Sequence, residues 1–438
     1  MLSPAAVAAL ILLIGIVVLI IASVPVAIAI GLPSLIAAMA VLGPENAAQA
    51  VTQRMFTGTN SFTLLAIPFF VLAGSLMNSG GIATRLIDAA KVLVGRMPAA
   101  MANTNIAANG MFGAVSGAAV AAASAVGTVM TPKMREEGYS RAYSAAVNVA
   151  SAPAGMLIPP SNTFIVYSLV SSTSIAALFM AGVGPGLLWL LAVAIVGTLL
   201  ARRENYKRAS EHPTFSQAML IIWRAFPSMM MIFIVVGGIL LGWFTPTESA
   251  SIAVVYCLVL GFAYGAIKVK DLPDILLRAT RTTSIVMMLI AVSAALSWVM
   301  AFARIPQMIS DGLLAVSDSK VVILLIMMVI LLLIGTVMDP TPAILIFVPI
   351  FLPVVMELGV DPVHFGAMVV MNLSVGVITP PVGNALFVGS QVAGLRVESV
   401  IGRLWPYLGA ILIALFLVVF IPAISMWLPT VMGLVSAG

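Results

Sequence analysis

Two Pro-Pro pairs, Pro159–Pro160 and Pro380–Pro381, lie inside long apolar segments of the sequence. Proline lacks a backbone donor and its ring clashes with the preceding helical turn, so each pair predicts a break in a helix. Small polar residues surround the two breaks: Ser151, Ser161, Asn162 and Thr163; and Asn372, Ser374, Thr379, Gly383 and Asn384. Their oxygens and the freed carbonyls are hard ligands that suit sodium. The alternative is a pair of structural kinks whose freed backbone groups are repaired by Ser and Thr.

The two breaks belong to an internal repeat. Residues 131–163 align without gaps with residues 352–384, at an offset of 221, and the identities include Gly155 with Gly376 and both Pro-Pro pairs. The basic residues beside the breaks change sides between the copies: Lys133, Arg135 and Arg141 precede the first break, whereas Arg396 and Arg403 follow the second. Because Lys and Arg mark cytoplasmic loops, the copies are expected to face opposite ways across a membrane. The repeat is therefore predicted to be inverted.

A second irregular segment precedes each break. Residues 101–132 carry no charge, are rich in Gly, Ala, Ser and Thr, and have basic clusters on both sides. A run that enters and leaves on one side is a re-entrant hairpin, here with its turn near 115–117. A single small-residue helix would instead place its two ends on opposite sides of the membrane. The counterpart in the second copy is expected at 334–353, with its turn near 339–342.

Asp339 is the only acid within the two hairpins and broken helices, loop residues aside. An intramembrane carboxylate is a functional candidate, but Asp before Pro also suits the N-cap and first position of a half-helix. Both roles remain open. No Lys or Arg occurs in 97–132, 142–201 or 321–395, so an anionic substrate would be held by half-helix N-termini, hydroxyls and a nearby cation.

These residues define three predicted sites. The first sodium site would use Ser116, Ser151, Gly155 and Ser161, and the second would use Asp339, Thr341, Gly376 and Thr379. Much of the coordination is expected from backbone carbonyls, which avoid the cost of burying further formal charges. The substrate is expected between the hairpin tips, near Ser116, Ser161, Asn162 and Asp339.

The elements that must position these residues are membrane helices. Of the 438 residues, 62% are hydrophobic and 8% are charged, and the mean hydropathy is +1.18, which excludes a water-soluble fold. We predict an all-α polytopic protein with about eleven spans or broken spans. They lie near 5–21, 24–43, 62–77, 142–168, 174–200, 228–244, 249–267, 283–302, 321–337, 365–393 and 407–430. A net charge of +5 on so large a chain does not favour nucleic acid binding.

Basic clusters set the expected topology. They are Arg85, Lys91 and Arg96; Lys133, Arg135 and Arg141; Arg202, Arg203, Lys207 and Arg208; and Lys268, Lys270, Arg278 and Arg281. These stretches are expected in the cytoplasm, with the N-terminus outside and the C-terminus inside. The amphipathic stretches 212–226 and 270–281 suit helices that lie along the membrane interface. The expected units are 1–80 (scaffold helices), 81–200 (first repeat), 201–281 (scaffold and interfacial arm helices with connecting spans) and 282–438 (second repeat).

Four segments resemble the large membrane subunit of the tripartite ATP-independent periplasmic (TRAP) transporters. They are NGMFGAVSGAAVAAASAVGTVMTPKMREEGY, IPPSNTFIVYSLVSSTSIAALFMAGVGPG, GTVMDPTPAILIFVPIFLPV and NLSVGVITPPVGNALFVGS. The resemblance implies an elevator-type, sodium-driven carrier of carboxylates such as C4-dicarboxylates or sialic acid in the bacterial inner membrane. It also implies a small four-helix membrane subunit, expected here as a separate polypeptide, and a periplasmic substrate-binding protein.

Other classes fit less well. A channel could use re-entrant hairpins, but it would not show counterflow. An intramembrane enzyme is disfavoured because no Ser/His, paired-carboxylate or metal-ligand constellation lies in the apolar segments. Within carriers, a stand-alone sodium–dicarboxylate symporter is the alternative, since residues 161–163 (SNT) resemble motifs of that kind. Dependence on a binding protein separates the two carriers.

Overall fold

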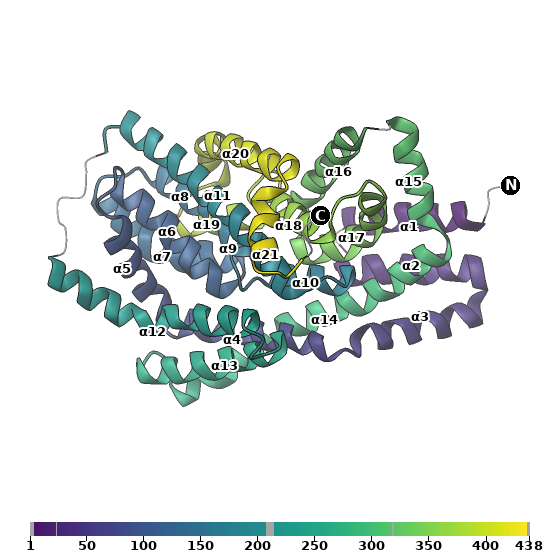
Figure 1. Cartoon of the computed structure of the whole chain (residues 1–438), viewed down its shortest axis with the longest axis horizontal. Helices are drawn as coiled ribbons and strands as arrows, with labels where there is room; N and C mark the ends of the chain where they lie inside the picture. Colours follow the sequence, from purple (N-terminus) through teal and green to yellow (C-terminus); the bar gives the residue numbers. More distant parts are fainter. Residues whose placement is uncertain (1–3, 23, 207–213, 318, 436–438) are drawn as a thin grey trace.

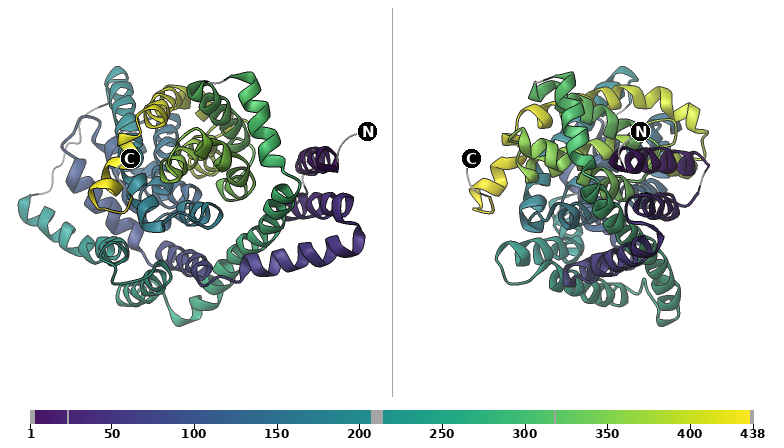
Figure 2. Two further views of the ribbon diagram at one scale, coloured as in Figure 1. Left: turned by 45° about the vertical axis from the view of Figure 1, so that its right-hand side comes forward. Right: turned by 90° about the vertical axis from the view of Figure 1, so that its right-hand side faces the viewer.

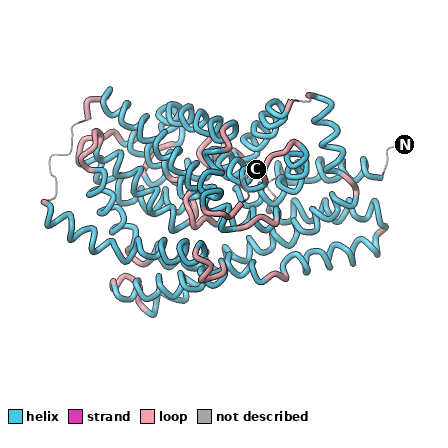
Figure 3. Tube along the Cα trace, viewed as in Figure 1, coloured by secondary structure: helices cyan, strands magenta, loops and turns pink. Residues whose placement is uncertain are grey.

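The computed structural model describes residues 4–22, 24–206, 214–317 and 319–435, and in these ranges every regular element is helical (Figure 3). Lys207 and Arg208 of the third basic cluster and residues 212–213 of the first amphipathic stretch lie outside them. The longer helices of the first half are α1 (Pro4–Ile21), α2 (Val26–Leu42), α3 (Pro44–Thr59), α4 (Ala66–Ser79), α5 (Ile82–Val94), α6 (Ala100–Ser116), α7 (Ala119–Glu136), α8 (Arg141–Ser151), α10 (Asn162–Ser171) and α11 (Ile175–Arg203). Those of the second half are α12 (Phe215–Leu240), α13 (Pro246–Ala263), α14 (Leu272–Phe302), α15 (Ile305–Val316), α16 (Lys320–Gly335), α17 (Pro340–Glu357), α18 (Pro362–Gly376), α19 (Asn384–Val392), α20 (Val397–Phe420) and α21 (Ala423–Val431).

Seven helical segments in the described part of the chain are long and apolar enough to cross a membrane. They are Phe62–Ser79, Ile175–Arg203, Phe215–Leu240, Pro246–Ala263, Val269–Phe302, Pro340–Glu357 and Val397–Phe420. Shorter apolar helices, such as α1, α2, α16 and α18, accompany them. The predicted all-α polytopic class is therefore confirmed, while the number of spans stays a prediction.

The repeat is visible as two matching runs of helices. In the first run, α6 and α7 form a hairpin (hairpin 1), α8 and α10 flank the first break, and α11 follows. In the second run, α16 and α17 form hairpin 2, α18 and α19 flank the second break, and α20 follows. Helix α17 begins at Pro340, 221 residues after α7 begins at Ala119. The alignment made on sequence thus extends from helix to helix.

Two expectations about the second repeat differ from the structure. Residues 321–337, expected as a separate span, form the first arm of hairpin 2, and this hairpin therefore begins well before residue 334. In the described residues, α12 begins at Phe215 and α14 at Leu272, and both helices continue from the amphipathic stretches into the following apolar residues, while the place of these stretches at the membrane interface stays a prediction. Pro227 lies inside α12 without ending it, as prolines do in membrane helices whose freed groups find other partners.

The matching runs form one body, and the remaining helices lie along its side. In Figure 1, α3, α4, α12, α13 and α14 run along the bottom, while α16, α18 and α20 lie above them. The turned view in Figure 2 shows the lower helices as an arc around the body that contains both hairpins. Helix α14 contacts α2, α3, α4 and α17, so it joins the arc to hairpin 2.

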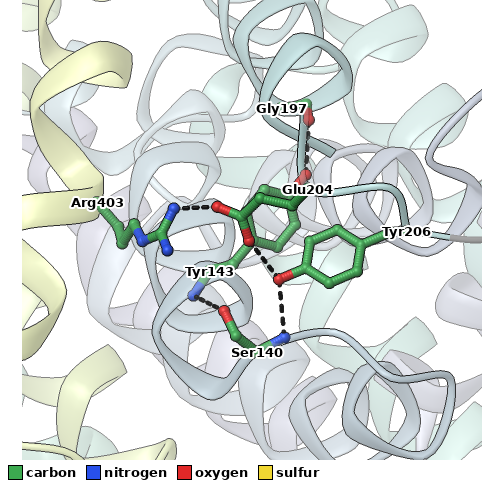
Figure 4. Close-up of polar contacts among 6 residues, drawn as sticks. All are labelled: Ser140, Tyr143, Gly197, Glu204, Tyr206 and Arg403. Carbon is green, nitrogen blue, oxygen red and sulfur yellow. Dashed lines mark hydrogen bonds and ion pairs between the residues drawn. The ribbon is translucent and has the colours of Figure 1, made fainter. Parts of the chain in front are cut away.

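A small polar cluster ties the first repeat to the second (Figure 4). Arg403 on α20 donates to the carboxylate of Glu204, which ends α11. The hydroxyl of Tyr206 donates to the other oxygen of Glu204 at 2.5 Å and accepts from the backbone N–H of Ser140 at 3.1 Å. These residues (Ser140, Glu204, Tyr206 and Arg403) are called the Glu204 clasp below.

Two further tyrosines extend the clasp. The hydroxyl of Tyr143 donates to the carbonyl of Gly197 at 2.6 Å, and its backbone N–H donates to Ser140 Oγ at 3.2 Å. Tyr139, in the loop between α7 and α8, stacks on Tyr206 with ring centroids 4.4 Å apart. Burial, and secondarily the Glu137 carboxylate, raise the pKa of Tyr139 to about 12. Tyr139 therefore stays neutral, and the ion pair is the charged part of the clasp.

We expect Tyr206→Phe to destabilise the protein more than Arg403→Gln. The ion pair is half exposed, and such pairs contribute between about 0 and 1 kcal/mol. Tyr206→Phe removes the partly buried bond to Glu204, at about 1 kcal/mol, whereas water can replace its exposed bond from the Ser140 N–H at little cost. The measurement is thermal denaturation of the purified protein in detergent. The opposite order would show that the charge pair holds the clasp.

Candidate functional site

Hairpin 1 turns where the sequence predicted it. Helix α6 ends at Ser116, Gly117 adopts the left-handed conformation with φ 62°, and α7 begins at Ala119. The Gly117 N–H donates to the carbonyl of Gly113 at 2.7 Å, which closes the last turn of α6. A residue with a Cβ is disfavoured at this φ, so glycine sets the turn.

The Ser161 side chain forms hydrogen bonds on both sides of the first break. Its Oγ donates to the carbonyl of Met156 at 2.5 Å and accepts from the N–H of Phe164 at 3.4 Å, as the N-cap of α10. Ser161 is fully buried, and these two bonds leave one lone pair on its oxygen. The Ser161 hydroxyl, predicted as a ligand from the sequence, thus has a structural role at the break.

The tip of hairpin 1 lies against this break. A β-carbon added at Gly117 would come within 3.1 Å of the backbone nitrogen of Asn162 and 3.3 Å of the Pro160 carbonyl oxygen. Beside it, Ser116 Oγ is buried and has no hydrogen-bond partner among the described residues. Gly117, the neighbour of Ser116 in the turn, therefore lies against Asn162, and the Ser116 hydroxyl is left without a partner among the described residues.

The two predicted site glycines also allow backbones to touch. A β-carbon at Gly155 would lie 2.1 Å from the Cα of Gly113, and one at Gly376 would lie 2.3 Å from the carbonyl carbon of Gly335. In each repeat, a glycine at the break thus packs on a glycine in the first arm of the hairpin. Close packing explains why glycine occupies both positions, whether or not their carbonyls bind a cation.

Asp339 stands at the N-cap position of α17, but its side chain makes no capping bond to that helix. Its Oδ1 instead accepts from Asn384 Nδ2 at 2.7 Å, on the exposed side of the turn. Of the two roles left open by the sequence, side-chain capping is not the one this structure shows. A carboxylate can accept several hydrogen bonds, so Asp339 keeps acceptor capacity beyond its bond to Asn384.

A backbone hydrogen bond joins the second break to the turn of hairpin 2. Gly383 donates its N–H to the carbonyl of Thr336 at 3.3 Å, and Ala385 donates to the carbonyl of Val377 at 3.1 Å. Thr379 Oγ1 donates at 2.7 Å to the Val375 carbonyl, which also accepts from the Ile378 N–H at 3.2 Å. A narrow crevice lined by residues 335–338, 377 and 382–384 lies between the turn and the break.

A cavity of about 790 Å³ lies between the hairpin tips and the lower helices. Its walls include the first residues of four helices: Val26 and Ala27 of α2, Ala119 and Val120 of α7, Asn162 and Thr163 of α10, and Pro340 to Pro342 of α17. Among its lining residues, all in described ranges, Asp339 is the only charged one. Helix N-termini carry partial positive charge, so they can hold an anion without a basic side chain.

The predicted site residues relate to this cavity in different ways. Asn162, Asp339 and Thr341 line it. Ser116 adjoins it through Gly117, whereas Ser151, Gly155, Ser161, Gly376 and Thr379 lie behind it, at the breaks. The far wall was missed by sequence reasoning: it is built by α4 and α14, with Ile67, Val71, Thr282, Ser284, Ile285 and Met288. Its apolar residues resemble any other span in the sequence.

A buried asparagine cluster was also missed. Asn109 Nδ2 lies 2.8 Å from Asn105 Oδ1, 3.0 Å from Asn148 Oδ1 and 2.9 Å from Ser151 Oγ. Ser151, predicted as a sodium ligand, thus belongs to this cluster and also donates to the Val147 carbonyl. Asparagines four residues apart in an uncharged apolar segment were the available signal.

Two broken helices related by an internal repeat, with one cavity between the hairpin tips, are typical of a membrane carrier. The family model described as "Tripartite ATP-independent periplasmic transporter, DctM component" matches residues 13–424. The chain belongs to this family of TRAP transporter large permeases, as the sequence resemblance implied.

Curated relatives match most of the chain, and two of the following three are named as TRAP transporter large permeases. The uncharacterized protein YgiK of Salmonella typhimurium is 49% identical over 93% of this chain and 94% of its own length. The sialic acid TRAP transporter large permease protein SiaM of Vibrio cholerae is 36% identical, over 86% of this chain and 88% of its own. The C4-dicarboxylate TRAP transporter large permease protein DctM of Pseudomonas aeruginosa is 36% identical, over 89% and 91%.

A solved structure shares the fold. The Alcanivorax borkumensis YdaH transporter superposes with a TM-score of 0.67, covering 87% of this chain and 89% of its own, at 14% identity. At that identity the likeness concerns the fold alone. SiaM and DctM are named as permeases, which accords with the expectation that this chain is not an enzyme.

We expect Asp339→Asn to fold normally but to need about tenfold more sodium for half-maximal uptake, equivalent to ~1.4 kcal/mol. Asparagine keeps an oxygen that can accept from Asn384 but removes the charge that would offset a bound cation in a low-dielectric site. Sodium-dependent uptake into proteoliposomes is the measurement.

Asp361→Asn is the matched control. Asp361 also precedes a proline at a helix start, but it does cap its helix, accepting from the Val363 N–H at 2.7 Å, and it does not line the cavity. Its sodium dependence should be unchanged. Near-normal sodium dependence in Asp339→Asn itself would remove Asp339 from the site.

Proposed function

We propose that this chain is the large permease of a sodium-coupled system that imports an organic acid across the bacterial inner membrane. The observation that carries the proposal is the cavity in which four helix N-termini meet without a basic residue in its lining. An anion there is stabilised by helix dipoles and by a bound cation. This arrangement therefore favours joint binding of the substrate and the cation.

Sodium is the cation that the available ligands fit. The sites offer neutral hydroxyl and carbonyl oxygens and a single carboxylate, Asp339, which are hard ligands for a small cation. The unpartnered Ser116 hydroxyl beside the first break supports a ligand there. We propose one sodium site around Ser116, Ser151, Gly155 and Ser161, and a second around Asp339, Thr341, Gly376 and Thr379.

The substrate class follows the named relatives. Sialic acid and C4-dicarboxylates are the substrates in the names of two relatives, and both are carboxylates. We propose a substrate of this class, bound near Ser116, Ser161, Asn162 and Asp339. The body that holds both hairpins would carry it across the membrane as an elevator, against the arc that contains α3, α4, α12, α13 and α14.

The family description also bears on partners. "Tripartite" supports a small four-helix membrane subunit and a periplasmic binding protein that delivers the substrate. It disfavours the stand-alone symporter. In this topology the N-terminus is periplasmic, and the basic clusters and the C-terminus are cytoplasmic.

The test is uptake of labelled carboxylates into proteoliposomes that contain the chain with its small subunit. Uptake should require both an inward sodium gradient and the binding protein. Uptake that is independent of sodium would refute the coupling, and uptake without a binding protein would restore the stand-alone symporter.

Ser116→Ala and Ser161→Ala should separate ligand binding from support of the break. Ser116 has no described partner, so Ser116→Ala should leave the melting temperature unchanged while it raises the half-saturating sodium or substrate concentration about fivefold, the equivalent of ~1 kcal/mol. Ser161→Ala should also lose roughly 1 kcal/mol of stability, because a cap is removed. If both variants keep wild-type uptake kinetics, the proposed pocket is wrong.

A further inference from the structure

The two hairpins are attached to their broken helices by different chemistry. In the first repeat, the Asn109 amide of α6 donates toward Asn148 and Ser151 of α8. Asn148 in turn donates to the carbonyl of Ala123 in α7 at 2.8 Å. One side chain of the broken helix therefore binds both arms of hairpin 1.

These bonds are buried and tightly packed. Asn109 and Asn148 are at most 1% exposed, and a β-carbon at Gly127 of α7 would lie 2.5 Å from Asn148 Nδ2. Opening hairpin 1 would leave several amide groups without partners in an apolar interior, and each such group costs about 1–3 kcal/mol. The cluster therefore resists any separation of hairpin 1 from α8.

Among the described residues, the second repeat has no equivalent cluster. At the offset of 221 residues, Asn109 corresponds to Ile330 and Asn148 to Val369. The side chains of Ile330 and Val369 have no amide group, so they form no such hydrogen bonds. One amide bond does cross to the first arm, from Asn372 Nδ2 to the Met328 carbonyl at 2.9 Å.

The tip of hairpin 2 is held by weaker contacts. The bond between Asp339 and Asn384 is solvent-exposed, and the Gly383 N–H donates to Thr336 at 3.3 Å. Water can replace an exposed hydrogen bond at little cost, since the freed groups are solvated. Asp339 is also the predicted cation ligand, so a bound sodium ion would act directly on this attachment.

We infer that Asn109 and Asn148 are positioning residues that keep hairpin 1 fixed to the first broken helix, and that hairpin 2 is the hairpin that opens. The inference rests on the proposed sodium-coupled transport in one respect only, which is the identity of the ion that closes hairpin 2. Hairpin 1 then presents Ser116 and Gly117 to the cavity as a preformed surface throughout the cycle. Entry and release of substrate and cation take place beneath hairpin 2.

The experiment measures distances within each repeat by pulsed electron paramagnetic resonance. Spin labels at Val120 and Ser171 report on hairpin 1 against α10, and labels at Val337 and Phe387 report on hairpin 2 against α19. Cys257 is fully buried, so labelling is directed to the introduced cysteines. The full chain with its small subunit is studied in lipid nanodiscs, with sodium and with choline in its place.

The first pair should give one narrow distribution with or without sodium. The second pair should be broader in choline and should narrow when sodium is added. In Asn109→Leu, the distance distribution of the first pair should become as broad as that of the second pair in choline. Uptake by this variant should also fall when equal amounts of protein are compared. Asn103→Leu is the control, because Asn103 is a buried asparagine of the same helix that bonds to Pro98 and Thr198 instead.

Three outcomes overturn the inference: a first pair as broad as the second in the wild type, no change of the first pair in Asn109→Leu, or equal broadening in Asn103→Leu. A second pair that stays broader than the first but ignores sodium supports the difference between the hairpins. That result would count against the proposed sodium coupling instead.

Discussion

The structure depends on one constraint: backbone groups at membrane depth must have hydrogen-bond partners. Two helices break in this protein, and each break frees such backbone groups. Residues close to the breaks provide the hydrogen-bond partners. Ser161 donates to the Met156 carbonyl, Thr379 donates to the Val375 carbonyl, and the Gly383 N–H donates to the Thr336 carbonyl in the turn of hairpin 2. The glycine pairs let the first arm of each hairpin pack directly on the break.

The same constraint shapes the cavity. The first turn of a helix has N–H groups without an intrahelical partner, and the first residues of four helices line the cavity. Backbone groups could therefore hold the proposed anionic substrate without a basic side chain. Asp339, the one carboxylate in the cavity lining, is the group that the proposed cation would neutralise.

Much of this could be predicted from residues that dictate backbone shape. The Pro-Pro pairs located both breaks, Gly117 located the first turn, and the spacing of 221 residues related the two halves. Residues whose role depends on a distant partner could not be placed this way. Asn148 bonds to a carbonyl 25 positions away, and the wall formed by α4 and α14 consists of side chains that look like any span. The start of hairpin 2 was misplaced because its first arm is as apolar as a full span.

Trp189, which fits no interfacial belt, is fully buried, and its indole N–H donates to the Ala150 carbonyl at 2.8 Å, just before the first break. Four of the other five tryptophans, Trp223, Trp243, Trp405 and Trp427, are more than 60% exposed. One indole of the chain is thus bonded to the discontinuous helix, whereas four others lie on the outer surface. A quencher that dissolves in lipid should therefore suppress the fluorescence of those four tryptophans more strongly than that of Trp189.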